Sequence, residues 1–179
     1  ERPSLLIVEL DGPAAPIEAE MAEVVAVMTR EGPTRMLSAR DEAERQQIWQ
    51  VRRQVSLRIH DHAALYLSED VVVPLSAIAT LVDALAAHEA RHGVEIFAFG
   101  HAGDGNIHLN ITSQHPDHQE QMDRVAEELL RMVLDLGGTI SGEHGIGLAK
   151  RPFLPLELSP GSIDLQRRIK ALFDPNQIL

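Results

Sequence analysis

A glycine-rich turn between two apolar runs is the feature that most restricts the fold of this chain. Residues 94–100 and 107–112 are rich in apolar and β-branched side chains, and Gly103-Asp104-Gly105-Asn106 separates them. Glycine and asparagine accept the backbone conformations of a tight turn at little steric cost. The segment therefore predicts a β-hairpin, whose adjacent strands count against a doubly wound parallel sheet, the competing architecture.

Helical and strand-like patterns alternate along the rest of the chain. Apolar residues recur at helical spacing in five segments: residues 17–29, 41–59, 76–92, 116–136 and 162–173. Four further runs are typical of strands: residues 4–10, 34–37, 65–73 and 138–141. A chain of 179 residues is long enough for one domain with a hydrophobic core. We expect an α+β fold, a largely antiparallel sheet with helices packed on one face in a ferredoxin-like-type sandwich.

Charge and composition exclude several classes of function. The formal net charge of −11 and the lack of a basic stripe argue against a nucleic-acid partner, since phosphate binding needs clustered lysine and arginine. Apolar runs are short and interrupted by charge, so we expect no transmembrane segment. The chain has no cysteine, which excludes disulfides and thiol chemistry. Aromatic residues make up only 3% of the chain, so it is poorly equipped to build a stacking platform for a base or a flavin alone.

The predicted hairpin carries two histidines that the turn can bring together. His101 precedes the turn and His108 follows it, so their side chains can approach each other across the two strands. Strand alternation sends the apolar residues of the second strand toward the core, namely Ile107, Leu109 and Ile111. Its polar residues share the opposite face, namely His108, Asn110 and Thr112. An imidazole and an amide two residues apart on one face indicate the wall of a pocket.

A second glycine-rich segment, residues 142–147, places a carboxylate beside a histidine. Glu143 would supply a metal ligand and His144 a proton acceptor, while the glycines would let the backbone approach a ligand closely. His101, His108 and Glu143 form a set that zinc, manganese and iron all accept, with positions open for substrate or water. The alternatives are that the histidines cap the hairpin beside a plain loop, or that the loop binds phosphate, although it lacks the Lys-Ser/Thr pair of such loops.

The other histidines and cations are expected to have no chemical role. Six histidines are assigned to the surface or to turns and caps: His60, His62, His88, His92, His115 and His118. Lys150 and Arg151 follow the second glycine-rich segment and are expected to be solvated. Arg52 lies in a predicted helix, where a surface salt bridge is the default, although a guanidinium is also the best side chain for holding a carboxylate at two points.

Several stretches together resemble a known family. They are spread over nearly the whole chain, at residues 48–52, 69–74, 100–110, 138–147, 150–151 and 173–176. They resemble the C-terminal domain of FAD-linked oxidases of the vanillyl-alcohol-oxidase type. The branch that they match contains the D-lactate, D-2-hydroxyglutarate and glycolate dehydrogenases, including the glycolate oxidase flavoprotein subunit. The two histidine and glutamate motifs at this separation carry most of the resemblance.

The resemblance implies that residues 1–179 are a C-terminal cap domain and that an N-terminal FAD-binding domain of the same protein lies outside this segment. The two ends, Glu1-Arg2-Pro3 without a methionine and Ile178-Leu179 without a polar tail, also fit a fragment. In this family the N-terminal domain holds most of the FAD, while the C-terminal domain covers the flavin and forms the substrate pocket. The implied reaction oxidises a small D-2-hydroxy acid to the 2-oxo acid, with FAD and a divalent zinc, manganese or iron ion.

The resemblance also assigns roles to residues by position. His101, His108 and Glu143 correspond to the family's metal ligands, and His144 to its catalytic base. Three residues fall at substrate-binding positions: Arg52, which matches the arginine that holds the substrate carboxylate, Asn110 and Ser56.

One departure from the family concerns Ser68. Relatives that handle a second carboxylate can carry a lysine there, so the serine favours a small monocarboxylate such as lactate or glycolate. Two other interpretations stay open: a metal-binding or structural domain with no activity of its own, and a metal-dependent hydrolase. For the full-length protein we expect a cytoplasmic location, with peripheral membrane association and a homodimer left open.

Overall fold

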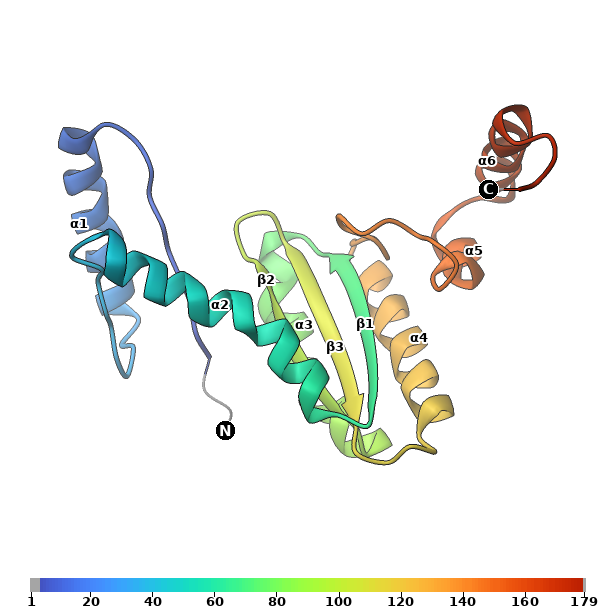
Figure 1. The fold of residues 1–179 in the computed structure, drawn as a ribbon, viewed down its shortest axis with the longest axis horizontal. Coiled ribbons are helices and arrows are strands. Elements are labelled where there is room, and N and C mark those ends of the chain that lie inside the picture. Colours follow the sequence, from blue (N-terminus) through green and yellow to red (C-terminus); the bar gives the residue numbers. More distant parts are fainter. Residues whose placement is uncertain (1–3, 179) are drawn as a thin grey trace. The chain divides into compact units, whose positions relative to one another are not determined.

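The computed structural model describes residues 4–178. It contains two compact units, Glu1–Val51 and Arg52–Leu179, and the boundary between them lies within helix α2 (Glu42–His62) (Figure 1). In the described part of the chain, no helix is both long and apolar enough to cross a membrane.

The first unit is built around α1 (Ala14–Arg30) and the beginning of α2. Glu9 precedes α1 and contacts α2 through two side chains: it accepts hydrogen bonds from Arg45 Nη1, at 2.7 Å, and from the Trp49 indole nitrogen. These polar contacts attach the extended segment before α1 to the start of α2.

Two predicted strands in this unit, residues 4–10 and 34–37, are wrong. Neither run belongs to a strand in the structure, and several of their apolar side chains are exposed: Leu5, Leu6, Val8, Met36 and Leu37. An apolar run predicts burial, but a strand also needs a neighbouring backbone that completes its hydrogen bonds. Among residues 4–178 no such neighbour pairs with these runs.

The second unit contains a three-stranded antiparallel sheet in the order β1-β3-β2. Its strands are β1 (Leu65–Val72), β2 (Glu95–His101) and β3 (Asn106–Ser113). The last two form the predicted hairpin. Gly105 in its turn has a φ of +79°, and a Cβ there would lie 2.0 Å from the Val73 carbonyl oxygen, so the turn requires glycine.

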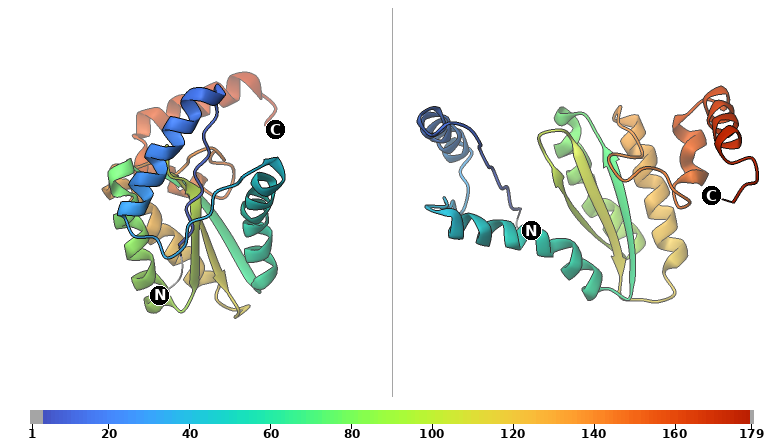
Figure 2. Two further views of the ribbon diagram at one scale, coloured as in Figure 1. Left: turned by 90° about the vertical axis from the view of Figure 1, so that its left-hand side faces the viewer. Right: turned by 45° about the horizontal axis from the view of Figure 1, so that its top comes forward.

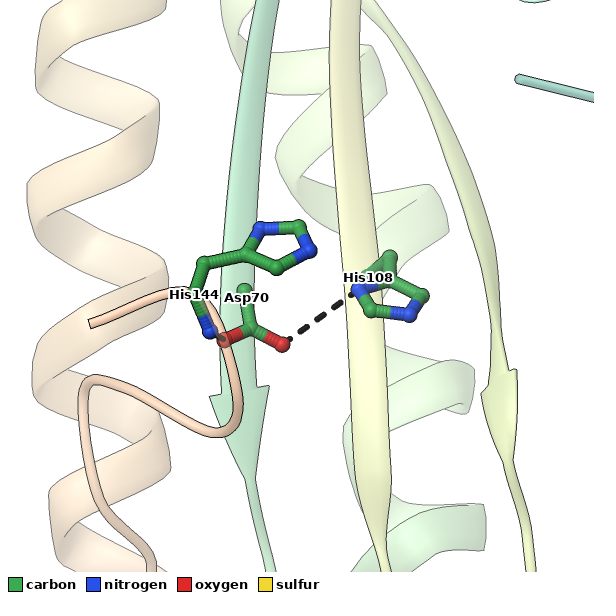
Figure 3. Close-up of side chains that lie close together, drawn as sticks. All are labelled: Asp70, His108 and His144. Atoms are coloured by element: carbon green, nitrogen blue, oxygen red, sulfur yellow. Dashed lines mark hydrogen bonds and ion pairs between the residues drawn. The ribbon is translucent and has the colours of Figure 1, made fainter.

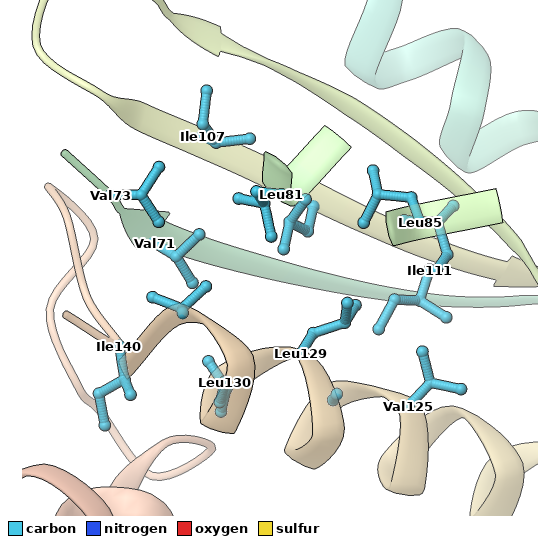
Figure 4. Packing of buried hydrophobic residues seen from close by; sticks show 14 of the residues in the cluster. Val71, Val73, Leu81, Leu85, Ile107, Ile111, Val125, Leu129, Leu130 and Ile140 are labelled. Atoms are coloured by element: carbon cyan, nitrogen blue, oxygen red, sulfur yellow. The ribbon is translucent and has the colours of Figure 1, made fainter. Parts of the chain in front are cut away.

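Two helices cover one face of this sheet. They are α3 (Ile78–His92), preceded by the short 3-10 helix η1 (Leu75–Ala77), and α4 (Gln119–Asp135). Figure 2 shows both helices on the same side of the sheet, and their apolar faces form the core with the strands. Figure 4 shows part of this core: Val71, Leu81, Leu85, Ile107, Ile111, Val125, Leu129 and Ile140. The predicted α+β class, an antiparallel sheet with packed helices, is confirmed.

Between α4 and residue 178 the chain adds no full strand to the sheet. The strand predicted at residues 138–141 is reduced to a single bridge between Val72 and Thr139, because a loop turns away immediately afterwards. Two short elements follow, η2 (Arg151–Phe153) and α5 (Leu154–Glu157), and then the longer helix α6 (Pro160–Phe173).

Lys150 is buried, so the prediction that it is solvated is wrong. Its Nζ donates hydrogen bonds to the carbonyl oxygens of Asp70, at 2.5 Å, and Ile140, at 2.7 Å. The same nitrogen lies 3.3 Å from Glu69 Oε2, and both side chains are nearly inaccessible to solvent. Lys150 therefore holds the segment after α4 against β1.

We expect Lys150→Met to lower the free energy of unfolding by about 3–5 kcal/mol, because it leaves a buried carboxylate without its counter-charge. Burial already raises the pKa of Glu69, although the charge of Lys150 opposes this rise. Urea unfolding of the full-length protein measures the loss. The double variant Lys150→Met/Glu69→Gln should recover part of it, and a single variant as stable as the wild type would contradict the pairing.

Candidate active site

A row of three residues crosses the sheet on the face opposite α3 and α4. The strand register places Asp70 of β1 beside His108 of β3, and His108 beside Phe99 of β2. The Asp70 side chain is completely buried, and His108 is 6% exposed. The ring centroids of Phe99 and His108 are 5.3 Å apart. The centre of this face is therefore a buried polar site with an aromatic edge.

Asp70 attaches the second glycine-rich loop to this row. Its Oδ2 accepts hydrogen bonds from the backbone N–H groups of Gly142 and His144, both at 2.9 Å. Its Oδ1 accepts a third from Asn106 Nδ2, also at 2.9 Å. A Cβ at Gly142 would lie 2.2 Å from that Asn106 nitrogen, so the loop can approach this closely only with glycine there.

The Asp70 carboxyl group remains ionised. Burial alone would raise its pKa, but hydrogen bonds from the His144 and Gly142 backbone, together with the charges of His144 and Lys150, lower it overall. One ionised carboxylate thus organises both the loop and the end of the hairpin.

The anchored loop brings His144 against His108. Their rings are stacked, with centroids 5.1 Å apart and planes 17° from parallel (Figure 3). Burial lowers the pKa of His108, against the opposing effect of the Asp70 charge, which favours a neutral ring near pH 7. A neutral imidazole can offer a lone pair to a metal or to a proton.

His101, His108 and Glu143 converge as the sequence predicts. The rings of His101 and His108 meet edge to face at 5.9 Å, and His108 Nε2 lies 3.5 Å from Glu143 Oε1. Each of the three residues offers one ligand atom, all within 4.8 Å of one another. Ligand atoms around a tetrahedral zinc ion are about 3.3 Å apart. The donor set fits a divalent metal with modest side-chain adjustment.

The two nitrogens of His108 face different partners. Nδ1 lies 3.3 Å from Asp70 Oδ1, and Nε2 faces Glu143. A carboxylate behind a ligating histidine fixes the ring orientation and makes the other nitrogen a better donor. Asp70, His108 and His144 also form a possible ligand group. However, the Asp70 oxygens already accept three hydrogen bonds, so His101, His108 and Glu143 fit a metal better.

The three predicted substrate-binding residues differ in their surroundings. Arg52 on α2 places its guanidinium 4.7 Å from the centre of the Phe99 ring, which adjoins His108. Ser56 follows one helical turn later and is half-buried. Asn110 is completely buried, where its Oδ1 accepts from the Tyr66 hydroxyl and its Nδ2 donates to the Phe97 carbonyl. The Asn110 amide therefore connects β3 to Tyr66 of β1 and Phe97 of β2 in this structure.

An open hollow of about 290 Å³ adjoins the cluster. It is lined by Val72, Asp104, Asn106, Gly142 and Glu143. A hollow of this volume suits a small ligand.

Sequence reasoning missed Asp70, Phe99 and Asn106. Asp70 lies in a predicted strand, yet a carboxylate followed directly by three valines is a signal of its own. A charge within a buried strand needs partners, and partners on other segments indicate a site. The stacking of Phe99 with Arg52 depends on tertiary structure and leaves no local signal.

Comparison with protein families now identifies the class. The model of the family "FAD linked oxidases, C-terminal domain" matches residues 1–179, and the chain belongs to this family. The expected resemblance is confirmed.

Individual relatives agree with this assignment. The chain is 34% identical over 178 residues to glycolate oxidase subunit GlcD of Bacillus subtilis, covering 98% of this chain and 38% of that protein. It is 30% identical to mitochondrial D-lactate dehydrogenase (cytochrome) 1 of Saccharomyces cerevisiae, covering 91% and 29%. It is 33% identical to D-2-hydroxyglutarate dehydrogenase of Stutzerimonas stutzeri, covering 79% and 31%. The chain thus spans less than two fifths of the length of each of these relatives.

Proposed function

We propose that this chain is the substrate- and metal-binding domain of an FAD-dependent dehydrogenase that oxidises a small D-2-hydroxy acid to the 2-oxo acid. The observation that carries the proposal is the convergence of His101, His108 and Glu143 beside His144. The three relatives are named for glycolate, D-lactate and D-2-hydroxyglutarate, all of which carry a hydroxyl next to a carboxylate. An N-terminal domain of the same protein would hold most of the FAD.

In this proposal His101, His108 and Glu143 hold a divalent zinc, manganese or iron ion. Bound metal would supply Lewis acidity at the substrate hydroxyl, and bound FAD would accept the hydride from the substrate C2. Asp70 would orient His108 so that Nε2, which faces Glu143, is available to the metal. The fixed loop keeps Glu143 at the same site.

His144 acts as the general base on the substrate hydroxyl. Its ring is about half exposed and stacked on His108, so it can reach a bound ligand while its backbone stays fixed by Asp70. Histidine is the side chain most often used to accept a proton around neutral pH. The hydroxyl proton thus goes to His144 and the C2 hydrogen leaves with its electron pair, which yields the 2-oxo acid.

Arg52 binds the substrate carboxylate. Its guanidinium already lies over Phe99 beside the site, and a planar fork of donors matches a carboxylate at two points. Ser56, one turn along α2, is proposed as a further polar contact. Asn110 would contact the substrate only after releasing Tyr66 or Phe97, so its main contribution is to hold the wall.

The substrate is a small monocarboxylate such as lactate or glycolate. Ser68 lies opposite Asn110 in the strand register and is exposed. A serine supplies no positive charge for a second carboxylate, so a dicarboxylate would be left with one unpaired charge.

A substrate panel with the full-length protein tests this function. We expect D-lactate or glycolate to reduce a flavin-linked dye with kcat/KM at least tenfold above that for D-2-hydroxyglutarate. Preference for the dicarboxylate would overturn the assignment of Ser68. Hydrolysis of ester or phosphate substrates without dye reduction would favour the metal-dependent hydrolase.

A further inference from the structure

A second group of potential metal ligands lies on the other side of the sheet, between the two covering helices. His88 and His92 are one turn apart near the end of α3, and Glu128 lies on α4. The histidine side chains are only 14% and 12% exposed. The prediction that they lie on a surface face of the helix is therefore wrong, because α4 packs over that face of α3.

Both imidazoles point at one carboxylate oxygen. His88 Nδ1 lies 3.1 Å from Glu128 Oε2, and His92 Nε2 lies 3.0 Å from the same atom. The two rings are nearly parallel, with planes 8° apart and centroids separated by 6.4 Å. The N···O distances are close to the separation of about 3.3 Å between ligand atoms in a tetrahedral zinc site.

The local sequence also matches a known way of binding zinc. Residues 88–92 read His-Glu-Ala-Arg-His, in which two histidines at i and i+4 share one helix face. Such a pair needs a third ligand from elsewhere, and Glu128 on the neighbouring helix lies in that position. The motif alone is a weak signal, but here the folded chain adds the carboxylate at ligand distance.

The intervening Glu89 does not act as a base at this group. Its Oε1 accepts a hydrogen bond of 2.6 Å from the backbone N–H of Ile96, at the start of β2. A carboxylate held in this way is not directed at a metal-bound water, so the group lacks the feature that would make it hydrolytic.

Arg91 is the competing partner of Glu128. Its Nη1 lies 3.3 Å from Glu128 Oε2, and its side chain is 63% exposed. An exposed arginine contributes little as an ion-pair partner and can move into solvent. Arg91 Nη1 and the two histidine nitrogens all lie within 3.3 Å of the same Glu128 oxygen.

We propose that His88, His92 and Glu128 bind a zinc ion that links α3 to α4, with water as the fourth ligand. Glu128 is about a third exposed, which leaves access for that water. The ion would stabilise the helix layer that covers the core and would be separate from the cluster containing His101 and His108.

Zinc titration of the full-length protein tests this site after metals are removed with a chelator. The variant His101→Ala/His108→Ala removes the first cluster and should still bind one zinc ion. Cobalt in that variant should give the absorption bands of a tetrahedral complex, and zinc should raise its thermal unfolding midpoint. Adding His92→Gln should lower zinc affinity at least 100-fold and abolish both signals.

A second comparison avoids the altered first cluster. In the otherwise unchanged protein, His88→Gln should reduce the bound zinc by one equivalent while dye reduction stays normal. His62→Gln, a change at an exposed histidine, should leave the zinc content unchanged. The proposal is wrong if zinc affinity survives His92→Gln, or if zinc content is the same in His88→Gln and wild type. Because turnover is measured separately, failure of this site leaves the proposed dehydrogenase activity untouched.

Discussion

His144→Ala in the full-length protein is expected to reduce kcat by about 10²–10⁴-fold, because the substrate hydroxyl loses its proton acceptor. The loop should keep its position, since Asp70 holds residue 144 through the backbone N–H and not through the imidazole. Substrate affinity should therefore change little. Dye reduction measures kcat, and perturbation of the flavin spectrum by the 2-oxo acid measures binding.

The matched control for this variant is His115→Ala, which removes an exposed histidine far along the chain from the loop. It should leave both turnover and binding unchanged. If kcat of His144→Ala were within a few fold of the wild-type value, another group would have to accept the hydroxyl proton.

Asp70→Asn should weaken metal binding by about 10–100-fold, the usual cost of losing a residue that orients a metal ligand. In the wild type both carboxylate oxygens face donors: the Gly142 and His144 N–H groups on one side and Asn106 on the other. An asparagine must turn its NH₂ group toward one of these sides, where it would face another N–H group and could not form a hydrogen bond with it. Burying that mismatch should also lower the free energy of unfolding by about 1–3 kcal/mol.

Metal titration and urea unfolding of Asp70→Asn measure these two effects. Excess metal should restore turnover, because the ligands themselves are intact. Asp83→Asn, at an exposed position on α3, provides the control for a neutralised aspartate. A folded Asp70→Asn protein with wild-type metal affinity would contradict the role given to Asp70.

The parts of the fold that local sequence determines were predictable. The hairpin follows from the turn around Gly105, and the helices follow from apolar spacing within each segment. The apolar runs at residues 4–10 and 34–37 were misassigned, because strand formation depends on a distant partner that an apolar pattern does not reveal.

The sequence predicts the side chains that could bind metal or accept a proton at the site, but not the residues that hold them in place. His101, His108, Glu143 and His144 carry visible chemistry in two glycine-rich motifs, and the structure brings them together. The connection through Asp70 joins segments more than 70 residues apart, so it has no local pattern.

The burial of several charged and titratable side chains was also not predicted from the sequence. Lys150 and the pair His88 and His92 look like surface residues in the sequence, yet each is covered by packing between segments far apart in the chain. Such burial becomes visible only once the helices and the sheet are assembled.

Anaerobic mixing of the full-length protein with D-lactate or glycolate tests the central claim most directly. We predict that the absorbance of oxidised flavin is lost in a single turnover, with one equivalent of 2-oxo acid formed per flavin. Removing the divalent metal should slow this step strongly, and restoring it should recover the rate. The proposed dehydrogenase function would be contradicted if the flavin stayed oxidised with every D-2-hydroxy acid tested. The protein used must be shown to contain both FAD and metal.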